Sequence, residues 1–108
     1  MTFSTVLDDL ERLKQLYTMG FHDAFLENAL RKMIERQIAR DEADLQRINE
    51  VLVQFEQRFG LTSDEFWQKF QAGQLADTAD FIEWNAFCKM RQRLLSRLHI
   101  LRDNGDHE

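Results

Sequence analysis

No proline interrupts this chain of 108 residues, and its four glycines stand far apart, at positions 20, 60, 73 and 105. The rest of the chain is rich in Leu, Glu, Gln, Arg and Ala, the residues that lose least free energy on entering a helix. Glycine takes up the left-handed backbone conformation that ends a helix at low cost. The sequence therefore predicts an all-α protein in which glycines mark helix ends.

Apolar residues at helical spacing define two helices before residue 60. The first is expected from about Thr5 to Met19. Its apolar stripe has spacings of three and four residues and consists of Val6, Leu10, Leu13 and Tyr17. The second is a long central helix from Phe21 or His22 to Phe59, and its roughly 38 residues would span about 57 Å. Such a helix is longer than a small domain is wide.

A coiled-coil seam follows the second half of the long helix and recurs in a last helix, expected from about residue 80 to 102. The seam residues are Leu45, Ile48, Leu52, Phe55 and Phe59 on the long helix, and Trp84, Phe87, Leu94, Leu98 and Leu101 on the last one. Their matching periods predict an antiparallel helical hairpin. Asp41 and Arg91 each interrupt a seam. Because a buried carboxylate is costly unless it is paired, either the packing partner changes between Arg40 and Asp44 or Asp41 pairs with Arg91.

Five aromatic residues gather in the segment from Leu61 to Trp84, which connects the two arms of this hairpin and begins the second arm. Thr62 and Glu65 have the spacing of a capping box, which predicts a short helix from there to about Gly73. Asp80 and Glu83 repeat that spacing at the start of the last helix. Aromatic rings fill the wedge where a chain turns back, and partly exposed rings are enriched at protein interfaces. The candidate partner-binding residues, serving either the core alone or the core and an interface, are Phe66, Trp67, Phe70, Phe81 and Trp84.

The predicted packing is only two helices thick. The last and first helices, at about 23 and 15 residues, would together cover the long helix, yet the long helix would stay apolar on more than one side. We expect a second copy to supply the missing layer and to give a dimeric bundle; the alternative is a monomer capped by the short helix. Residues 1–102 are predicted to form a single all-helical domain, and residues 103–108 a flexible tail.

The residue types that carry most catalysis are few and scattered. Of the histidines His22, His99 and His107, His22 adjoins Asp23, but adjacent positions on a helix point in different directions, and His107 lies in the predicted tail DNGDHE. Cys88 falls on an apolar face, where a buried structural thiol is expected. No glycine-rich phosphate loop, paired-histidine helix motif or calcium loop occurs in the sequence. We therefore expect no enzyme, no cofactor and no metal site.

The charge of the chain, −5, argues against general nucleic-acid binding, which relies on lysine and arginine. The last helix does carry the cations Lys89, Arg91, Arg93, Arg97 and Arg102. They are expected to pair with acids of the long helix and to complement the negative end of their own helix. No run of about 18 apolar residues could cross a bilayer, and the acidic start lacks the basic patch of a signal peptide. We expect a cytoplasmic protein.

The segment RFGLTSDEFWQKFQAGQLADTADFIEWNAFCKMRQRL, with the helix before it, resembles a group of small bacterial and archaeal proteins of largely unknown function. Their pattern is a long helix followed by Y/F-G-M/L-S/T-S-x-E-F-aromatic-x-x-F-x-x-G-x-L-x-D-x-x-D-F-x-E-W. It is met here by Phe59, Gly60, Leu61, Thr62, Ser63, Glu65, Phe66, Trp67, Phe70, Gly73, Leu75, Asp77, Asp80, Phe81, Glu83 and Trp84. Members look like the small helical partner encoded beside a toxin, so the resemblance implies an antitoxin-like role.

The leading hypothesis is therefore a non-enzymatic interaction module that neutralises a cognate toxin by covering it with helical surface, with the aromatic segment as a contact. A self-associating structural or adaptor protein is one alternative, in which all five aromatic residues belong to the core. Nucleic-acid binding through the basic last helix is the other.

Overall fold

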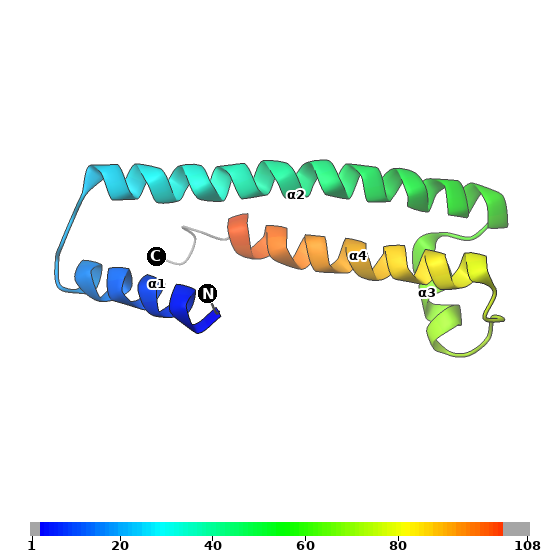
Figure 1. The fold of residues 1–108 in the computed structure, drawn as a ribbon. Coiled ribbons are helices and arrows are strands. Elements are labelled where there is room, and N and C mark those ends of the chain that lie inside the picture. Colours follow the sequence, from blue (N-terminus) through cyan, green and yellow to red (C-terminus); the bar gives the residue numbers. More distant parts are fainter. Residues whose placement is uncertain (1–2, 103–108) are drawn as a thin grey trace. The chain divides into compact units, whose positions relative to one another are not determined.

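The structure of the protein is a computed structural model that describes residues 3–102, with side chains from Thr5 onward. This range consists of four helices joined by short connections (Figure 1). They are α1 (Phe3–Thr18), α2 (Ala24–Phe59), α3 (Ser63–Gln71) and α4 (Ala79–Arg102). The predicted all-α fold is confirmed. The predicted tail, residues 103–108, lies outside the described residues.

The boundary between α1 and α2 is set by a glycine and an aspartate. α1 ends at Thr18, and Gly20 follows with φ of 98°, a conformation that residues with a side chain rarely adopt. α2 begins at Ala24, slightly later than predicted. The reason is Asp23, whose Oδ2 accepts a hydrogen bond from the backbone N–H of Leu26 at 2.8 Å, as an N-cap residue does.

The chain divides into two compact units between Met33 and Ile34. The first unit holds α1 and the beginning of α2, and the second holds the rest of α2 together with α3 and α4. α2 itself is one continuous helix of 36 residues that contributes to both. The predicted single domain over residues 1–102 stays a prediction.

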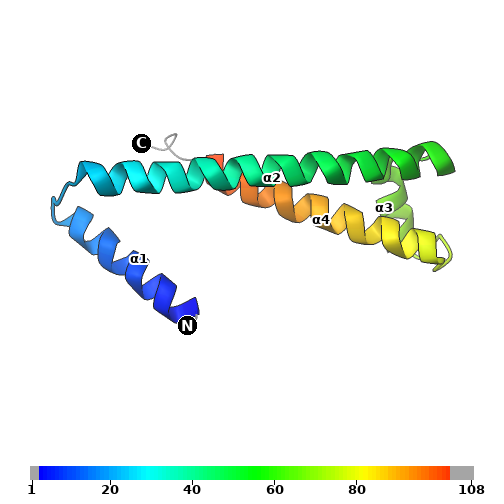
Figure 2. The ribbon, with the colours of Figure 1, turned by 45° about the horizontal axis from the view of Figure 1, so that its top comes forward.

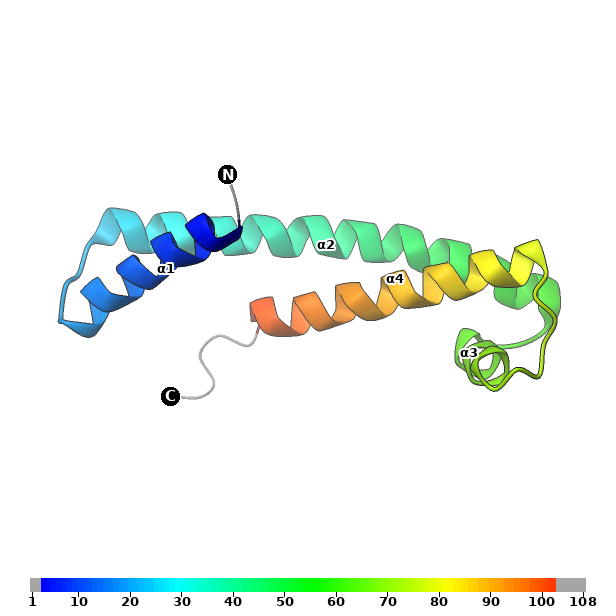
Figure 3. The ribbon, with the colours of Figure 1, turned by 60° about the horizontal axis from the view of Figure 1, so that its bottom comes forward.

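The second unit is an antiparallel helical hairpin with a short helix at its turn, as predicted. α4 runs beside the second half of α2 in the opposite direction (Figure 2). α3 crosses the closed end of the hairpin, where Figure 3 views it nearly end-on. The core residues come from all three helices and include Ile48, Leu52, Phe55, Phe66, Trp84, Cys88 and Leu94. Because the two predicted seams supply most of them, burial of the seams holds the arms together.

Burial along α2 changes where Asp41 interrupts the seam. From Ala24 to Arg40 no residue of the helix is buried, whereas Asp41 is 0% exposed. The apolar core residues of the helix follow, beginning with Ile48. The buried part of α2 therefore starts at the position that the sequence marked as a change in packing.

The carboxylate of Asp41 is paired, but not with Arg91. Arg97 of α4 donates to it through Nε at 3.1 Å and through Nη2 at 2.6 Å, and Gln37 Nε2 donates at 2.9 Å. Arg91 instead donates to Asp64 of α3 at 3.0 Å. The predicted alternative of an Asp41–Arg91 pair is wrong, because the register of the hairpin brings Arg97 to Asp41.

The two predicted helix caps have different outcomes. α3 opens on the predicted capping box: Thr62 Oγ1 accepts from the Glu65 N–H, and Glu65 Oε1 accepts from the Thr62 N–H, both at 3.0 Å. α4 begins one residue after Thr78, whose Oγ1 accepts from the Phe81 N–H at 3.1 Å. The predicted cap at Asp80 is wrong, because this residue already lies in the first turn of α4.

Candidate protein-interaction surfaces

Phe66 of α3 and Trp84 of α4 form the centre of the aromatic segment. Their rings stack with centroids 4.0 Å apart and an interplanar angle of 4°. Phe55 of α2 stacks on Trp84 at 5.4 Å. Both Phe66 and Trp84 are 0% exposed. These two candidate residues therefore lie in the core, where a partner reaches them only if the unit opens.

A buried serine links three helices beside these rings. The Nε1–H of Trp84 donates to Ser63 Oγ at 3.1 Å, and the Ser63 N–H donates to Glu56 Oε2 of α2 at 2.7 Å. Ser63 is fully enclosed, and a buried polar group that loses its hydrogen-bond partner is costly. The sequence does not predict these two hydrogen bonds, because local spacing does not mark a bond across the turn between α2 and α3.

The other three candidate residues, Trp67, Phe70 and Phe81, are half-buried and pack against the core of the second unit. Phe70 stacks on Phe66 with centroids 5.3 Å apart, and Phe81 meets Phe59 edge to face at 5.0 Å. Successive positions on a helix point in different directions. Phe66 can therefore be enclosed while Trp67, its neighbour in the chain, keeps part of its ring at the surface.

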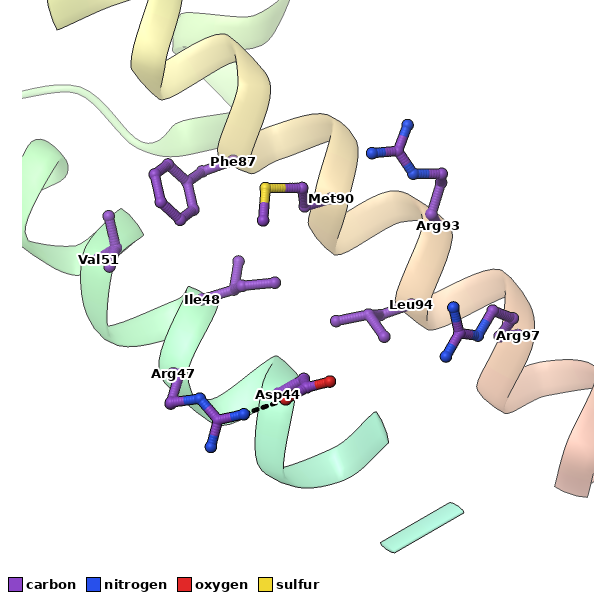
Figure 4. Close-up of a pocket in the computed structure, with 9 residues that line it drawn as sticks. All are labelled: Asp44, Arg47, Ile48, Val51, Phe87, Met90, Arg93, Leu94 and Arg97. Atoms are coloured by element: carbon purple, nitrogen blue, oxygen red, sulfur yellow. Dashed lines mark hydrogen bonds and ion pairs between the residues drawn. The ribbon is translucent and has the colours of Figure 1, made fainter. Parts of the chain in front are cut away.

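An open groove runs between α2 and α4 (Figure 4). Its volume is about 420 Å³. Apolar side chains from both helices point into it, namely Ile48, Val51, Phe87, Met90 and Leu94. A second depression shares Val51 and Phe87 with it and continues toward the turn, as far as Asp80 and Glu83. The hairpin therefore carries a concave surface whose floor is apolar in the first groove, whereas the part toward the turn is also lined by Gln54, Arg58, Asp80 and Glu83.

Unbalanced positive charge lies on the α4 side of this groove. Arg47 forms an ion pair with Asp44 on α2, and Arg97 is held by the buried carboxylate of Asp41. Arg93 lines the groove, is exposed, and has no ion-pair partner among the residues that the structure describes. Lys89, one turn earlier on α4, is likewise exposed and unpaired within that range.

The first unit buries none of its described side chains. Every residue from Thr5 to Met33 is either exposed or only half-buried. The large apolar residues that are strongly exposed there are Val6, Leu7, Leu10, Leu16, Met19, Phe21, Phe25, Leu30 and Met33. Large exposed apolar surfaces on a protein mark sites of interaction. The first unit is therefore a stronger candidate than the aromatic segment, although the sequence pattern drew attention to the latter.

Polar contacts hold the turn of the first unit. The hydroxyl of Tyr17 donates to Glu27 Oε2 at 3.0 Å and accepts from the Asp23 N–H at 3.2 Å. Desolvation and the bond to Glu27 raise the pKa of Tyr17. The same bond is the main cause of the lowered pKa of Glu27. The turn is thus held by hydrogen bonds and by the edge-to-face contact of Tyr17 with Phe21, with ring centroids 5.6 Å apart, rather than by a buried apolar core.

Among the described histidines and Cys88, the only ion pair is that of His22 with Glu27 at the exposed turn of the first unit, where His22 Nδ1 and Glu27 Oε2 lie 3.6 Å apart. Cys88 is buried, and desolvation raises the pKa of its thiol to about 11, so the thiol is protonated at neutral pH and is a poor nucleophile. His22 and His99 are exposed, and His107 lies outside the described range. Within residues 3–102, no group of three or more His, Cys, Asp or Glu side chains could hold a metal ion. None of the helices described there is long and apolar enough to cross a bilayer.

Three cations of α4 bind acids of the protein itself. The ion pairs are Arg91 with Asp64, Arg97 with Asp41, and Arg102 with Glu42. The expected pairing with acids of the long helix is therefore present for Arg97 and Arg102. Of the five cations named from the sequence, Lys89 and Arg93 have no ion-pair partner within the described range and could bind phosphate groups. Affinity for a phosphate backbone grows with the number of such contacts, so these two residues give little support to nucleic-acid binding.

Neither a protein-family model, nor a curated protein, nor a solved structure matches this chain. The resemblance to antitoxin-like proteins stays a prediction. The proposed function therefore rests on the surfaces described above.

Proposed function

We propose that this protein is a non-enzymatic interaction module that binds a cognate partner protein through the apolar surface of its first unit. One observation carries the proposal. No residue from Thr5 to Met33 is buried, although this stretch holds most of the strongly exposed large apolar side chains, with Leu7 63% and Phe25 80% exposed. A partner protein bound to the first unit would cover these apolar side chains.

The free energy of folding favours burial of the first unit's apolar surface against another chain. Ordering a residue in one backbone conformation costs about 1–2 kcal/mol, and segments below about 40 residues rarely bury enough surface to offset that cost alone. The first unit covers residues 1–33, and its turn is held by the hydrogen bonds of Tyr17 and by the edge-to-face contact of Tyr17 with Phe21. Burying its apolar stripe against a partner would contribute roughly 25 cal/mol for each Å² removed from water.

The resemblance to small proteins encoded beside a toxin supports a cognate toxin as the partner, in the cytoplasm, with this chain as the antitoxin. In this proposal the partner covers the first unit, and the half-buried rings of Trp67, Phe70 and Phe81 provide a second contact. Phe66 and Trp84 then support that contact from the core. The helical scaffold needs no catalytic group for such a role.

Co-expression with the protein encoded beside its gene tests the proposal, with the dissociation constant measured by calorimetry. The decisive variant is Leu10→Glu, at a position that is 50% exposed on α1. Its matched control is Ile100→Glu, at a position that is 71% exposed on α4. We expect Leu10→Glu to weaken the complex at least about tenfold, which is a loss of about 1.4 kcal/mol, and Ile100→Glu to leave it unchanged. Equal effects of the two changes, or no complex with the unmodified chain, would contradict the proposal.

The same exposed residues favour self-association as a second candidate function. Native mass spectrometry of the protein purified from its own host separates the two. A complex with another gene product that Leu10→Glu dissociates supports partner binding. A bare homodimer that Leu10→Glu converts to a monomer supports the structural alternative.

A further inference from the structure

The groove between α2 and α4 lies entirely in the second unit and is independent of the surface proposed above to bind the partner. Its floor is formed by Ile48 and Leu94, which are buried, and by Val51, Phe87 and Met90, which are half-buried. Figure 4 shows the floor side chains of the two helices facing one another across the groove. An apolar strip between two helices is the kind of surface that receives the apolar face of a third helix.

The length of the groove suits a short helix. The groove extends along α4 from Phe87 to Arg97. At 1.5 Å per residue this distance is about 15 Å, or about three turns of a helix. A helix of this length presents three or four apolar side chains along one stripe, enough to cover the floor.

The charges beside the floor select the chemistry of that helix. Arg93, which lines the groove on the α4 side, is exposed and has no ion-pair partner in the part of the chain that the structure describes. Lys89, one turn earlier, is likewise exposed and unpaired there, and it lines an adjoining depression that it shares with Arg93. The other cations near the groove, Arg47 and Arg97, already bind acids of this protein. Complementary charge at the rim of an interface speeds association and sets its orientation. Carboxylates on the incoming helix would form ion pairs with the unpaired cations.

The geometry points to the α2–α4 groove as a binding site for an amphipathic helix of another protein that carries Asp or Glu beside its apolar face. The apolar floor distinguishes this ligand from a nucleic acid. A phosphate backbone would use the two free cations but gain nothing from Ile48, Met90 and Leu94, which lie between the helices.

Two synthetic helical peptides of about 14 residues test the site, using the full chain and fluorescence anisotropy. Both carry the same stripe of leucines; one has glutamates and the other lysines beside it. We expect the glutamate peptide to bind roughly fivefold or more tightly than the lysine peptide at low salt. The variant Arg93→Glu reverses that order, and Met90→Glu, on the floor, weakens both peptides.

Arg36→Glu is the matched control. It makes the same charge change at an exposed position of α2 that does not line the groove, and it leaves the peptide preference unchanged. Circular dichroism melting of each variant shows whether the hairpin is folded, and the charge reversal by Arg93→Glu is a gain of binding that unfolding cannot mimic.

Equal binding of both peptides, or an equal effect of Arg36→Glu and Arg93→Glu, would overturn the inference. Binding of a labelled RNA oligonucleotide that is lost with Arg93→Glu, while the peptides do not bind, would also overturn it. So would a dimer in light scattering that Met90→Glu dissociates, because a second copy would then occupy the groove. Because Leu10 lies outside the groove, loss of partner binding in Leu10→Glu leaves this test unaffected.

Discussion

Arg97 of α4 donates two hydrogen bonds to the carboxylate of Asp41 of α2, from Nε at 3.1 Å and from Nη2 at 2.6 Å. Asp41 is 0% exposed, and its Oδ1 also accepts a hydrogen bond from Gln37 Nε2. The two residues of the pair are 56 positions apart in the chain. A buried carboxylate with such a partner fixes the register of two helices, because a shift of either helix would leave the charge unpaired.

Replacing Arg97 by alanine should lower the free energy of unfolding by about 1–3 kcal/mol. The change leaves the Asp41 carboxylate buried with only Gln37 as a donor, and the 55% exposure of the Arg97 side chain keeps the loss below that of a fully enclosed pair. Urea unfolding measures the difference. The control Arg102→Ala removes a half-exposed pair with Glu42 and should cost less than about 1 kcal/mol; equal losses would contradict a special role for Asp41.

The stability of the protein should fall in acid through Asp41. Desolvation raises the pKa of this carboxyl, but the hydrogen bonds and charge of Arg97 and the bond from Gln37 outweigh it, so the pKa is lowered. Because an unfolded aspartate titrates near pH 3.9, the stabilisation is present above about pH 4 and is lost as pH falls through the lowered pKa of the folded state. The stability difference between the unmodified chain and Asp41→Asn should therefore shrink below about pH 4. A constant difference down to about pH 2 would refute this.

Phe66 and Trp67 should separate folding from binding, although they are adjacent in the chain. Phe66 is 0% exposed and stacks on Trp84, so Phe66→Ala should cost about 3–5 kcal/mol of stability. Trp67 is half-buried, so Trp67→Ala should weaken the partner complex by a larger factor than it weakens the fold. Thermal melting and calorimetry on the same samples make the comparison. Proportionate losses in both measurements would assign Trp67 to the core alone.

The start of α4 should depend on Thr78 and not on Asp80. Thr78→Ala removes the acceptor for the Phe81 N–H and should cost about 1 kcal/mol, whereas Thr78→Ser should cost little. Asp80 accepts from Arg58 at the surface, and Asp80→Ala should cost less than about 1 kcal/mol. Chemical denaturation of the three variants ranks them. A larger loss for Asp80→Ala would restore the cap predicted from the sequence.

Cys88 should react with thiol reagents only when the hairpin opens. Desolvation raises its pKa to about 11, against about 8.5 for an exposed thiol, so little thiolate is present at about pH 8 in the folded state. The same shift means that stability is fully present below about pH 8.5 and declines as pH rises toward the raised value. Labelling should accelerate strongly in urea at the unfolding transition. Rapid labelling of the folded protein would show that the thiol is accessible.

The sequence by itself determined the helices and most of the core. The absence of proline, the spacing of the glycines and the T-x-x-E pattern at Thr62 act within one turn of backbone, and local patterns of this kind persist in the folded chain. The two seams paired as expected in an antiparallel hairpin, because each buries apolar residues only when it faces the other. Even the change in burial along α2 fell at Asp41.

Tertiary structure decided the partners across the hairpin and the surface left uncovered. Whether Asp41 meets Arg91 or Arg97 depends on the register of two helices, and the turn through α3 sets that register by bonds such as Trp84 to Ser63. The spacing of residues along the sequence predicts neither the contact of Asp41 with Arg97 nor that of Trp84 with Ser63. The exposed stripe of α1 is a further case: periodicity predicts that one face is apolar, but only the arrangement of the folded chain reveals whether anything covers that face.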